Sequence, residues 1–376
     1  MKSQWPMVKL NEACSLNMGQ SPDSSGYNDE GRGIPFYQGN ADFGALTPVT
    51  RFYCDNPTKI AHRGDILLSV RAPIGAVNIA NETCCIGRGL AALTACDSVD
   101  AKFLYYAIKS KHDELNAKGT GSTFKAINKK ALHETQIPLP VLAEQKNVAS
   151  ILDNVSGLAA LRKRQIMQLD LLAKSRFIEM FGDSKAKFQR LGDICSVGSS
   201  KRVFVEELQT KGIPFFRGTE VGRLAEDKDI EPTLFITEEH YIALCKHTGK
   251  PKIGDLLLPS ICPDGRVWCV NSERPFYFKD GRVLWVKVPD AINGCYLRFA
   301  LSQSIIENYS TLASGITFAE LKIVTLKEAP IPLPPLALQN EFAAFIEQLD
   351  KSKFTIRRSL EKLEMLYQAL LQEYFG

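Results

Sequence analysis

Three short motifs of the chain carry residue types whose spacing partly matches that of catalytic or cofactor sites. Ser122 and Lys125 have the Ser-x-x-Lys spacing of a serine nucleophile beside a lysine base. The corresponding stretch of an internal repeat reads Ile316-Thr317-Phe318-Ala319, so the pair is interpreted as accidental. Gly87-Arg88-Gly89 and Gly119-Thr120-Gly121 lack the third glycine of a dinucleotide-binding loop.

Signatures of other chemistry are missing from the sequence as well. It contains no Gly-x-x-x-x-Gly-Lys-Ser/Thr phosphate loop, no His-Glu-x-x-His pair and no Gly-x-Ser-x-Gly motif. The five histidines have no metal-ligand spacing, and the ten cysteines form no Cys-x-x-Cys. The cysteines are therefore predicted to be reduced and mostly buried. We expect a chain without catalytic residues, cofactor-binding residues or metal ligands.

An internal repeat organises the whole chain. Residues 119–182 align with 313–376 without a gap, and 19 of the 64 positions are identical. Upstream of these segments the match continues in short islands whose offset changes. The islands are Gly33-Ile34-Pro35-Phe36 with Gly212-Ile213-Pro214-Phe215, and Gly64–Leu68 with Gly254–Leu258. Each half therefore has a variable front part and a back segment of constant length.

The front parts, residues 7–141 and 187–335, mix short strand-like runs with turns and one longer helix. This mixture predicts two α+β domains, each long enough for its own core. An Asp280-Gly281 hairpin is expected to join the last two of the predicted strands. The predicted strands are Asp65–Val70, Ala76–Ile79, Phe276–Lys279 and Arg282–Val288, and the helices are Ala101–Leu115 and Gly294–Ser310.

The back segments follow Pro140 and Pro335, and their apolar residues recur at spacings of four and three, which indicates long helices. Arg162, Arg176 and Lys353 interrupt the stripes. Segments of about 34–40 residues span roughly 50–60 Å as helices, so we expect them to pair as an antiparallel coiled-coil-like spacer. The alternative is that each helix packs on its own front domain. The stripes are Val148, Leu152, Val155, Ala159, Ile166, Leu169, Ala173 and Met180, then Phe342, Ile346, Leu349, Ile356, Leu360, Leu363, Tyr367, Leu370 and Tyr374.

Composition places the chain among ordinary globular proteins, with 376 residues, 45% hydrophobic residues and a net charge of +4. No apolar run reaches the roughly 18 residues of a membrane span, and Met1–Pro6 lacks the apolar stretch of a signal peptide. We therefore expect a cytoplasmic protein without a membrane partner. The predicted parts are front domain 1 (1–141), central helix (142–182), front domain 2 (183–335) and C-terminal helix (336–376).

This duplicated order of variable α+β domain, Pro-rich stop and long helix resembles the specificity subunit of a type I restriction–modification system. The matching residues are Gly64–Gly75, Ile86–Ala92 and Ile137–Gln145, and in the second half Gly254–Leu258, Gly281-Arg282 and Ile331–Leu336. The second half departs from the first by having Leu338 in place of Glu144 and Pro259-Ser260-Ile261 in place of Ser69-Val70-Arg71.

The resemblance implies two target-recognition domains, each reading one half of an asymmetric, interrupted site in double-stranded DNA. It also implies that the helices set the spacing of the half-sites and dock two methyltransferase subunits, which restriction/translocase subunits join. Catalysis, S-adenosylmethionine, ATP and magnesium then belong to those partners.

Residues that read bases must be polar, long and placed on exposed loops. In the first half we predict Gln38, Asn40 and Asp42, which follow the Gly-Ile-Pro island, and in the second half Arg217, Thr219 and Glu220. Further candidates for base edges or phosphates are Arg71, Arg88, Arg266 and Arg282, and Lys125 is a candidate for phosphate contact.

Two other classes of function stay open at this point. One is a stand-alone DNA-binding regulator, and the other is a scaffold whose front domains bind protein rather than DNA. The net charge of +4 permits a nucleic-acid partner without requiring one.

Overall fold

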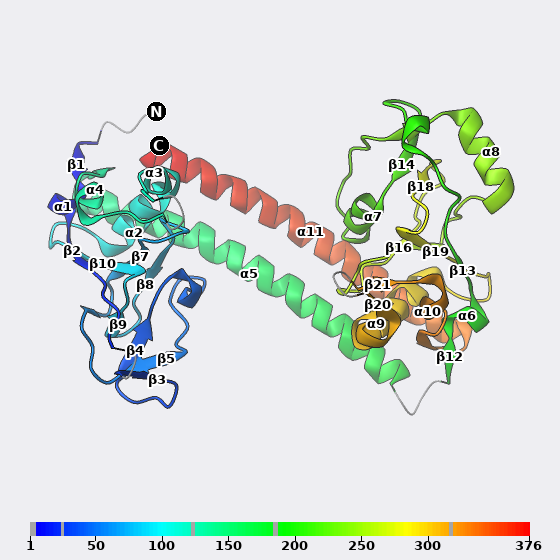
Figure 1. The fold of residues 1–376 in the computed structure, drawn as a ribbon, viewed down its shortest axis with the longest axis horizontal. Helices are drawn as coiled ribbons and strands as arrows, with labels where there is room; N and C mark the ends of the chain where they lie inside the picture. Colours follow the sequence, from blue (N-terminus) through cyan, green and yellow to red (C-terminus); the bar gives the residue numbers. More distant parts are fainter. Residues whose placement is uncertain (1–4, 24–25, 122–124, 183–186, 316–318) are drawn as a thin grey trace. The chain divides into compact units, whose positions relative to one another are not determined.

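The computed structural model describes residues 5–23, 26–121, 125–182, 187–315 and 319–376. The stretches 122–124 and 316–318, which decide the Ser-x-x-Lys comparison, lie outside the described residues, as do 183–186 at the predicted start of front domain 2. The chain divides into two compact units (Figure 1). Unit 1 comprises residues 1–165 and 356–376, and unit 2 comprises residues 166–355. Each of the two long helices contributes to both units.

Unit 1 contains an antiparallel four-stranded sheet in the order β2-β10-β7-β8 and a five-stranded sheet in the order β3-β5-β4-β9-β6. Within the second sheet β4 and β9 are parallel, with Phe36 opposite Cys85. The strands are β2 (Cys14–Met18), β3 (Tyr27–Asn28), β4 (Ile34–Tyr37), β5 (Phe52–Cys54), β6 (Ile60–Ala61), β7 (Ile66–Ser69), β8 (Val77–Ile79), β9 (Cys84–Ile86), β10 (Leu90–Ala95), and the antiparallel pair β1 (Met7–Lys9) and β11 (Gln136–Pro138).

One helix of unit 1 differs from its prediction. The helix expected over Ala101–Leu115 is two helices, because Lys111 has φ −89° and ψ 10° and leaves the helical conformation. The chain there passes close to Gly75, where an added Cβ would lie 2.9 Å from the His112 ring. The short helices of unit 1 are α1 (Leu10–Ala13), η2 (Asn40–Asp42), α2 (Ala101–Ser110), α3 (His112–Ala117) and α4 (Lys129–His133).

Unit 2 repeats this arrangement with a four-stranded sheet in the order β13-β19-β16-β17 and a three-stranded sheet in the order β15-β14-β18. Its β14 and β18 are parallel, as β4 and β9 are in unit 1. The strands are β12 (Phe188–Arg190), β13 (Ser196–Gly198), β14 (Ile213–Phe216), β15 (Phe235–Ile236), β16 (Leu256–Pro259), β17 (Trp268–Cys269), β18 (Tyr277–Phe278), β19 (Val283–Lys287), β20 (Ala313–Ser314), β21 (Glu320–Leu321) and β22 (Pro330–Pro332).

The prediction of a hairpin at Asp280-Gly281 is wrong. The strands on either side of it exist, but β18 pairs with β14 and β19 pairs with β13 and β16, in a different sheet. Gly281, with φ +65°, carries the chain from one sheet to the other. The expected helix over Gly294–Ser310 is confirmed as α9. The helices of unit 2 are η3 (Val205–Glu207), α6 (Leu191–Ile194), α7 (Gly218–Ala225), α8 (Glu238–Thr248), α9 (Gly294–Leu312) and α10 (Ile323–Leu326).

The repeated Gly-Asp sequence builds the same turn before the central strand of each four-stranded sheet. Gly64 and Gly254 have φ values of +94° and +91°, a conformation that glycine adopts without steric cost. The buried carboxylates that follow accept backbone N–H bonds, Asp65 from His62 at 2.7 Å and Asp255 from Lys252 at 3.0 Å. The glycine conformation and these hydrogen bonds explain why glycine and aspartate recur together in both halves.

The predicted long helices are α5 (Leu142–Phe181) and α11 (Leu336–Phe375). In unit 1 the beginning of α5, through Val148 and Leu152, shares a core with the end of α11, through Leu371 and Phe375. In unit 2 the end of α5 and the beginning of α11 share a core. The two helices therefore run antiparallel within each unit, and the predicted stripes form the less exposed face of each.

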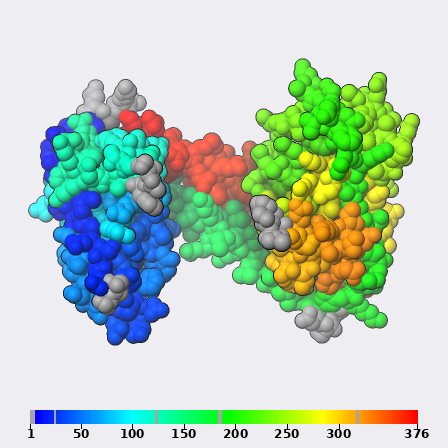
Figure 2. Space-filling model, viewed as in Figure 1, coloured from blue at the N-terminus to red at the C-terminus, as the bar shows by residue number. Residues whose placement is uncertain are grey.

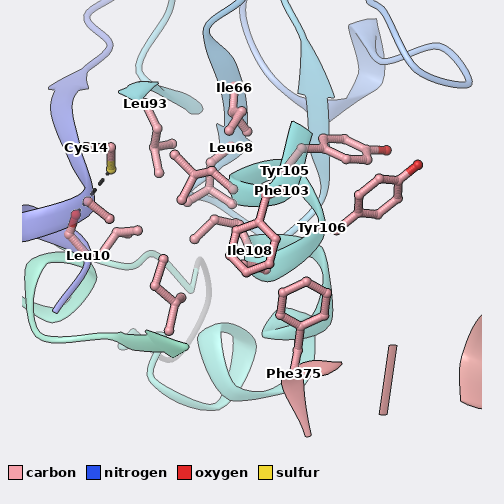
Figure 3. Close-up of a cluster of buried hydrophobic side chains, with 14 of the residues drawn as sticks. Leu10, Cys14, Ile66, Leu68, Leu93, Phe103, Tyr105, Tyr106, Ile108 and Phe375 are labelled. Carbon is pink, nitrogen blue, oxygen red and sulfur yellow. Dashed lines mark hydrogen bonds between the residues drawn. The ribbon is translucent and has the colours of Figure 1, made fainter. Parts of the chain in front are cut away.

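The core of unit 1 joins the four-stranded sheet to these helices (Figure 3). Ile66, Leu68 and Leu93 point from the sheet toward α2, whose Phe103 ring lies 5.2 Å from the ring of Phe375. Full burial of side chains of this size contributes about 1.5–3 kcal/mol each. The end of α11 is therefore part of the core of unit 1.

Two of the charged residues that interrupt the apolar stripes, Arg176 and Lys353, form ion pairs between the helices, whereas Arg162 bonds Gln165 on its own helix. Lys353 Nζ lies 2.7 Å from Asp170 Oδ1, and Arg176 Nη2 lies 3.1 Å from Glu341 Oε1, both within unit 2. In unit 1, Lys163 Nζ lies 2.8 Å from Glu364 Oε1. Within the part of the chain that the structure describes, no helix is long and apolar enough to cross a membrane.

Candidate nucleic-acid interface

The candidate residues of the first half line one cleft in unit 1, here called cleft 1, of about 580 Å³. Three of the segments that line it are Gln38–Asp42 after β4, the residues Ser69, Arg71 and Ala72 at the end of β7, and Arg88-Gly89 after β9. Five predicted residues, Gln38, Asn40, Asp42, Arg71 and Arg88, are thus brought together although they come from three separate parts of the sequence.

Backbone hydrogen bonds join the three segments of cleft 1. The Gly87 N–H donates to the Tyr37 carbonyl at 2.9 Å, the Gly89 N–H to the Gln38 carbonyl at 3.1 Å, and the Val70 N–H to the Gly89 carbonyl at 2.9 Å. A Cβ at Gly89 would lie 2.4 Å from the Gln38 oxygen, so only glycine allows this approach. The side chains of the cleft therefore extend from a fixed backbone frame.

Asp42 differs from the other candidates because it is buried, with 7% of its surface exposed. Its Oδ2 accepts the backbone N–H groups of Gln38 at 2.7 Å and Gly39 at 3.3 Å. Its Oδ1 accepts Arg51 Nη2 at 2.5 Å. These contacts indicate that Asp42 orients the loop on which Gln38 stands.

Sequence reasoning missed Arg51 and three aromatic residues of cleft 1. Arg51 reaches the cleft from the segment before β5, and half of its side chain is exposed. The Tyr27 ring centroid lies 5.3 Å from that of Phe36 and 6.3 Å from that of Phe52. Phe36 belongs to the Gly-Ile-Pro island. Arg51, Tyr27 and Phe52 belong to neither the repeat islands nor the quoted motifs, so no signal in the sequence pointed to these three.

The second half forms an equivalent cleft in unit 2, here called cleft 2, of about 440 Å³. It is built from the same three segments: Arg217-Gly218-Thr219 after β14, Pro259-Ser260-Ile261 at the end of β16, and Lys279 with Arg282 after β18. The hydrogen bonds correspond too, because the Lys279 N–H donates to the Phe216 carbonyl at 2.9 Å and the Ser260 N–H to the Arg282 carbonyl at 3.0 Å. Arg266 completes the lining, and Lys279 is the residue that sequence reasoning missed.

Arg217 and Glu220 form an ion pair at the start of α7. Arg217 Nη2 lies 2.7 Å from Glu220 Oε1, and Arg217 Nε lies 3.2 Å from Glu220 Oε2. Burial acts to raise the pKa of Glu220, but hydrogen bonds from the Arg217 side chain, the Arg217 backbone and the Thr219 hydroxyl outweigh it and lower this pKa to about 2. Glu220 is therefore ionised near neutral pH and holds the Arg217 guanidinium in place.

The other arginines of cleft 2 are also paired with acidic residues. Arg266 Nε bonds Asp264 and its Nη1 lies 3.4 Å from Glu226, so acidic groups contact it on two sides. The same Nη1 would lie 3.1 Å from a Cβ at Gly222, which places the guanidinium against α7. Arg282 Nη1 pairs with Glu320. Arg266 thus packs on the protein, while Arg217 and Arg282 keep about half of their side chains exposed.

Lys125 lies beside cleft 1 without lining it. Its carbonyl accepts the Ala72 N–H at 3.1 Å, and the next residue, Ala126, bridges to Arg71. The Lys125 side chain is exposed, which suits contact with a DNA backbone next to the cleft.

The remaining groups offer no metal centre in the ranges that the structure describes. No group of three or more His, Cys, Asp or Glu residues there could hold a metal ion. All ten cysteines are free, and six of them are buried. Burial raises the pKa of thiols such as Cys14 and Cys262 to about 12, so these behave as small apolar residues.

The sequence matches the family model described as the type I restriction modification DNA specificity domain twice, over residues 2–171 and 183–365. The chain belongs to this family. The two matches correspond to the two halves of the internal repeat, so each half is one specificity domain.

Known specificity subunits are similar in sequence to this chain to different extents. The chain is 43% identical to the putative MjaX specificity subunit of Methanocaldococcus jannaschii, over 45% of this chain and 41% of that protein. It is 28% identical to the MjaIX specificity subunit of the same organism, over 83% of this chain and 77% of that protein. The EcoBI specificity subunit of Escherichia coli is 21% identical over 99% of this chain and 85% of its own length.

Solved structures show the same fold. The S subunit of a type I restriction–modification system from M. genitalium covers 99% of this chain, and 96% of its own length is covered, with a TM-score of 0.63 at 19% identity. A chain from a study of complex assembly in the type I system gives a TM-score of 0.57, also at 19% identity, over 100% of this chain and 98% of its own. These matches confirm the expected α+β architecture with two specificity domains and long helices.

Proposed function

We propose that the chain is the non-catalytic specificity subunit of a type I restriction–modification complex, in which each unit reads one half of a bipartite, asymmetric DNA site. The observation that carries this proposal is the pair of clefts. Three corresponding segments line cleft 1 and cleft 2 and are joined by two corresponding backbone hydrogen bonds, yet the exposed side chains of the two clefts differ. Two clefts with a similar backbone arrangement but different side chains suit two half-sites of different sequence.

The charge of both clefts supports a DNA partner. Cleft 1 contains Arg51, Arg71 and Arg88, and cleft 2 contains Arg217, Arg266, Lys279 and Arg282. Cationic side chains around a groove attract the phosphate backbone, while polar side chains among them contact base edges. The amides Gln38 and Asn40 and the hydroxyl of Thr219 are the polar groups placed among these cations.

The long helices suit the docking of partner subunits and the spacing of the half-sites. Beyond the faces that pack within each unit, α5 and α11 expose large apolar side chains, and Figure 2 shows α5 in green and α11 in red at the surface. These include Leu161, Met167, Leu171, Ile178 and Met365. Two methyltransferase subunits would dock here, joined by restriction/translocase subunits, and S-adenosylmethionine, ATP and magnesium would be bound by those partners.

The decisive experiment is to express the chain with the methyltransferase subunit of its own system, in a host without any such system, and to map methylated adenines by sequencing. We expect one bipartite motif with two unlike halves and a fixed gap, absent when this chain is omitted. Copurification of both proteins and cytoplasmic localisation are expected as well. A stand-alone regulator would bind DNA without directing methylation, and a DNA-free scaffold would not bind DNA even at low salt.

A further inference from the structure

We infer that Gln38 and Arg217 occupy equivalent positions and each determine one base pair: Gln38 selects adenine in the half-site of unit 1, and Arg217 selects guanine in that of unit 2. This inference rests on the proposed function and assigns the chemistry by which the two clefts differ.

The equivalence follows from the strands that carry the two residues. Gln38 is the first residue after β4, and Arg217 is the first residue after β14. Each of these strands runs parallel to a partner, β9 or β18, whose following residue donates its N–H to the last carbonyl of the first strand. A helical turn with an acidic third residue follows in each unit, one residue later after Gln38 than after Arg217, with Asp42 in η2 and Glu220 in α7. Both side chains therefore start from the same place in the fold.

Glu220 determines which edge of Arg217 is presented to a ligand. The carboxylate accepts from Nε and Nη2, which form one edge of the guanidinium. The end edge, formed by Nη1 and Nη2, is not used by this ion pair, and 46% of the side chain is exposed. Two parallel N–H donors on this edge match the O6 and N7 acceptors of guanine in the major groove. Adenine would instead place its N6 amino donor against a donor.

Gln38 presents a different pattern from the same position. Its backbone N–H bonds Asp42 Oδ2 at 2.7 Å, which fixes the backbone, while its side chain is exposed in cleft 1. A carboxamide offers one donor and one acceptor side by side, which match N7 and N6 of adenine. Guanine would place its O6 acceptor against the amide oxygen. The exposed Phe52 ring in the same cleft offers apolar surface for the methyl group of the paired thymine.

The test exchanges the two side chains in the complex of this chain with its methyltransferase subunits. We expect Gln38→Arg to change one A·T pair of the first half-site to G·C, and Arg217→Gln to change one G·C pair of the second half-site to A·T. In each case the other half-site stays as it is. Short duplexes that differ only at that base pair measure the effect on binding. Each variant is expected to lose roughly 5- to 150-fold of the wild-type preference for the original base pair. Arg63→Gln and Gln168→Arg, exposed positions outside both clefts, are the matched controls.

Glu220 is a positioning residue in this inference, so Glu220→Gln is expected to weaken discrimination at the Arg217 pair alone. Copurification with the methyltransferase and a single cooperative melting transition show that each variant is folded. A wild-type bipartite motif that stays identical in both exchange variants, or that changes at pairs in both half-sites, overturns the inference while the proposed function stands. Absence of any bipartite motif for the wild type overturns both.

Discussion

Gln145 and Gln339, 194 positions apart, make matching bonds between a long helix and the domain before it. The Gln145 Nε2 donates to the Pro140 carbonyl at 2.8 Å, and the Gln339 Nε2 donates to the Pro334 carbonyl at 2.8 Å. The Oε1 of each accepts a backbone N–H at the start of a helix, from Asp100 at 2.8 Å and from Asn293 at 3.0 Å. Both side chains are 1% exposed. Each amide therefore ties a spacer helix to α2 or α9 of its own unit.

Replacing the first of these amides is expected to destabilise unit 1. Gln145→Leu keeps the volume but leaves the half-buried Asp100 N–H and the buried Pro140 carbonyl without partners, so the free energy of unfolding should fall by about 2–4 kcal/mol. Calorimetric melting of the purified chain measures this change. Gln168→Leu, an exposed glutamine on the same helix, is the control and should melt within about 0.5 kcal/mol of wild type. Equal losses in both variants would contradict the role of the buried amide.

The ion pair between Arg217 and Glu220 predicts an acid-sensitive contribution to unit 2. Because hydrogen bonds hold the folded pKa of Glu220 at about 2, below the ordinary value of 4.5, its stabilisation is complete above about pH 4.5. That stabilisation is lost as the pH falls from about 4.5 toward 2, since the unfolded chain binds the proton first. Fluorescence of Trp268 and Trp285, both in unit 2, follows the unfolding.

The variant Glu220→Gln should be less stable than wild type at pH 7 and should lose less stability between pH 4.5 and 2. The exposed Glu239, on α8, provides the control, because Glu239→Gln should leave the acid profile of unit 2 unchanged. Parallel acid profiles for wild type and Glu220→Gln would show that the ion pair contributes nothing to folding.

The length of the helix pair is expected to set the gap between half-sites. Seven residues inserted into both helices, after Gln168 in α5 and after Thr355 in α11, preserve the apolar stripes and add about 10.5 Å to each helix. At about 3.4 Å per base pair, the gap in the methylated motif should widen by about three base pairs. Methylation mapping decides the matter, and an active complex with its original gap would exclude the helices as the spacer.

An insertion in one helix alone provides the matched comparison for that experiment. Seven residues after Gln168 only would shift Asp170 away from Lys353 and bring unlike residues together along the stripe. We expect a lower melting temperature and loss of methylation rather than a wider gap.

The two domains are expected to be exchangeable. Replacing residues 7–141 with the corresponding part of a related specificity subunit, while keeping Gln145 and its helix, should change one half of the methylated motif only. The basis is that cleft 1 lies wholly within this segment. If mapping showed both halves altered, the assignment of one unit to one half-site would be wrong.

The sequence by itself determined the features that depend on local pattern. The stripes of α5 and α11 follow from helical periodicity, and the turns at Gly64 and Gly254 follow from a conformation that favours glycine. The Gly-Ile-Pro islands located Gln38 and Arg217 because the strand and the residue after it are contiguous in the chain.

Only the tertiary structure decided which of these residues meet. Asp280-Gly281 has the residues of a hairpin, but Tyr277 and Phe278 pair with β14, more than sixty positions earlier, and this pairing overrides the turn. Asp42 is polar and follows the same island as Gln38, yet the fold buries it against Arg51. Arg51, Phe52 and Lys279 reach the clefts through sheet pairings between distant segments. Such contacts depend on which strands become neighbours, and local residue preference carries no information about that choice.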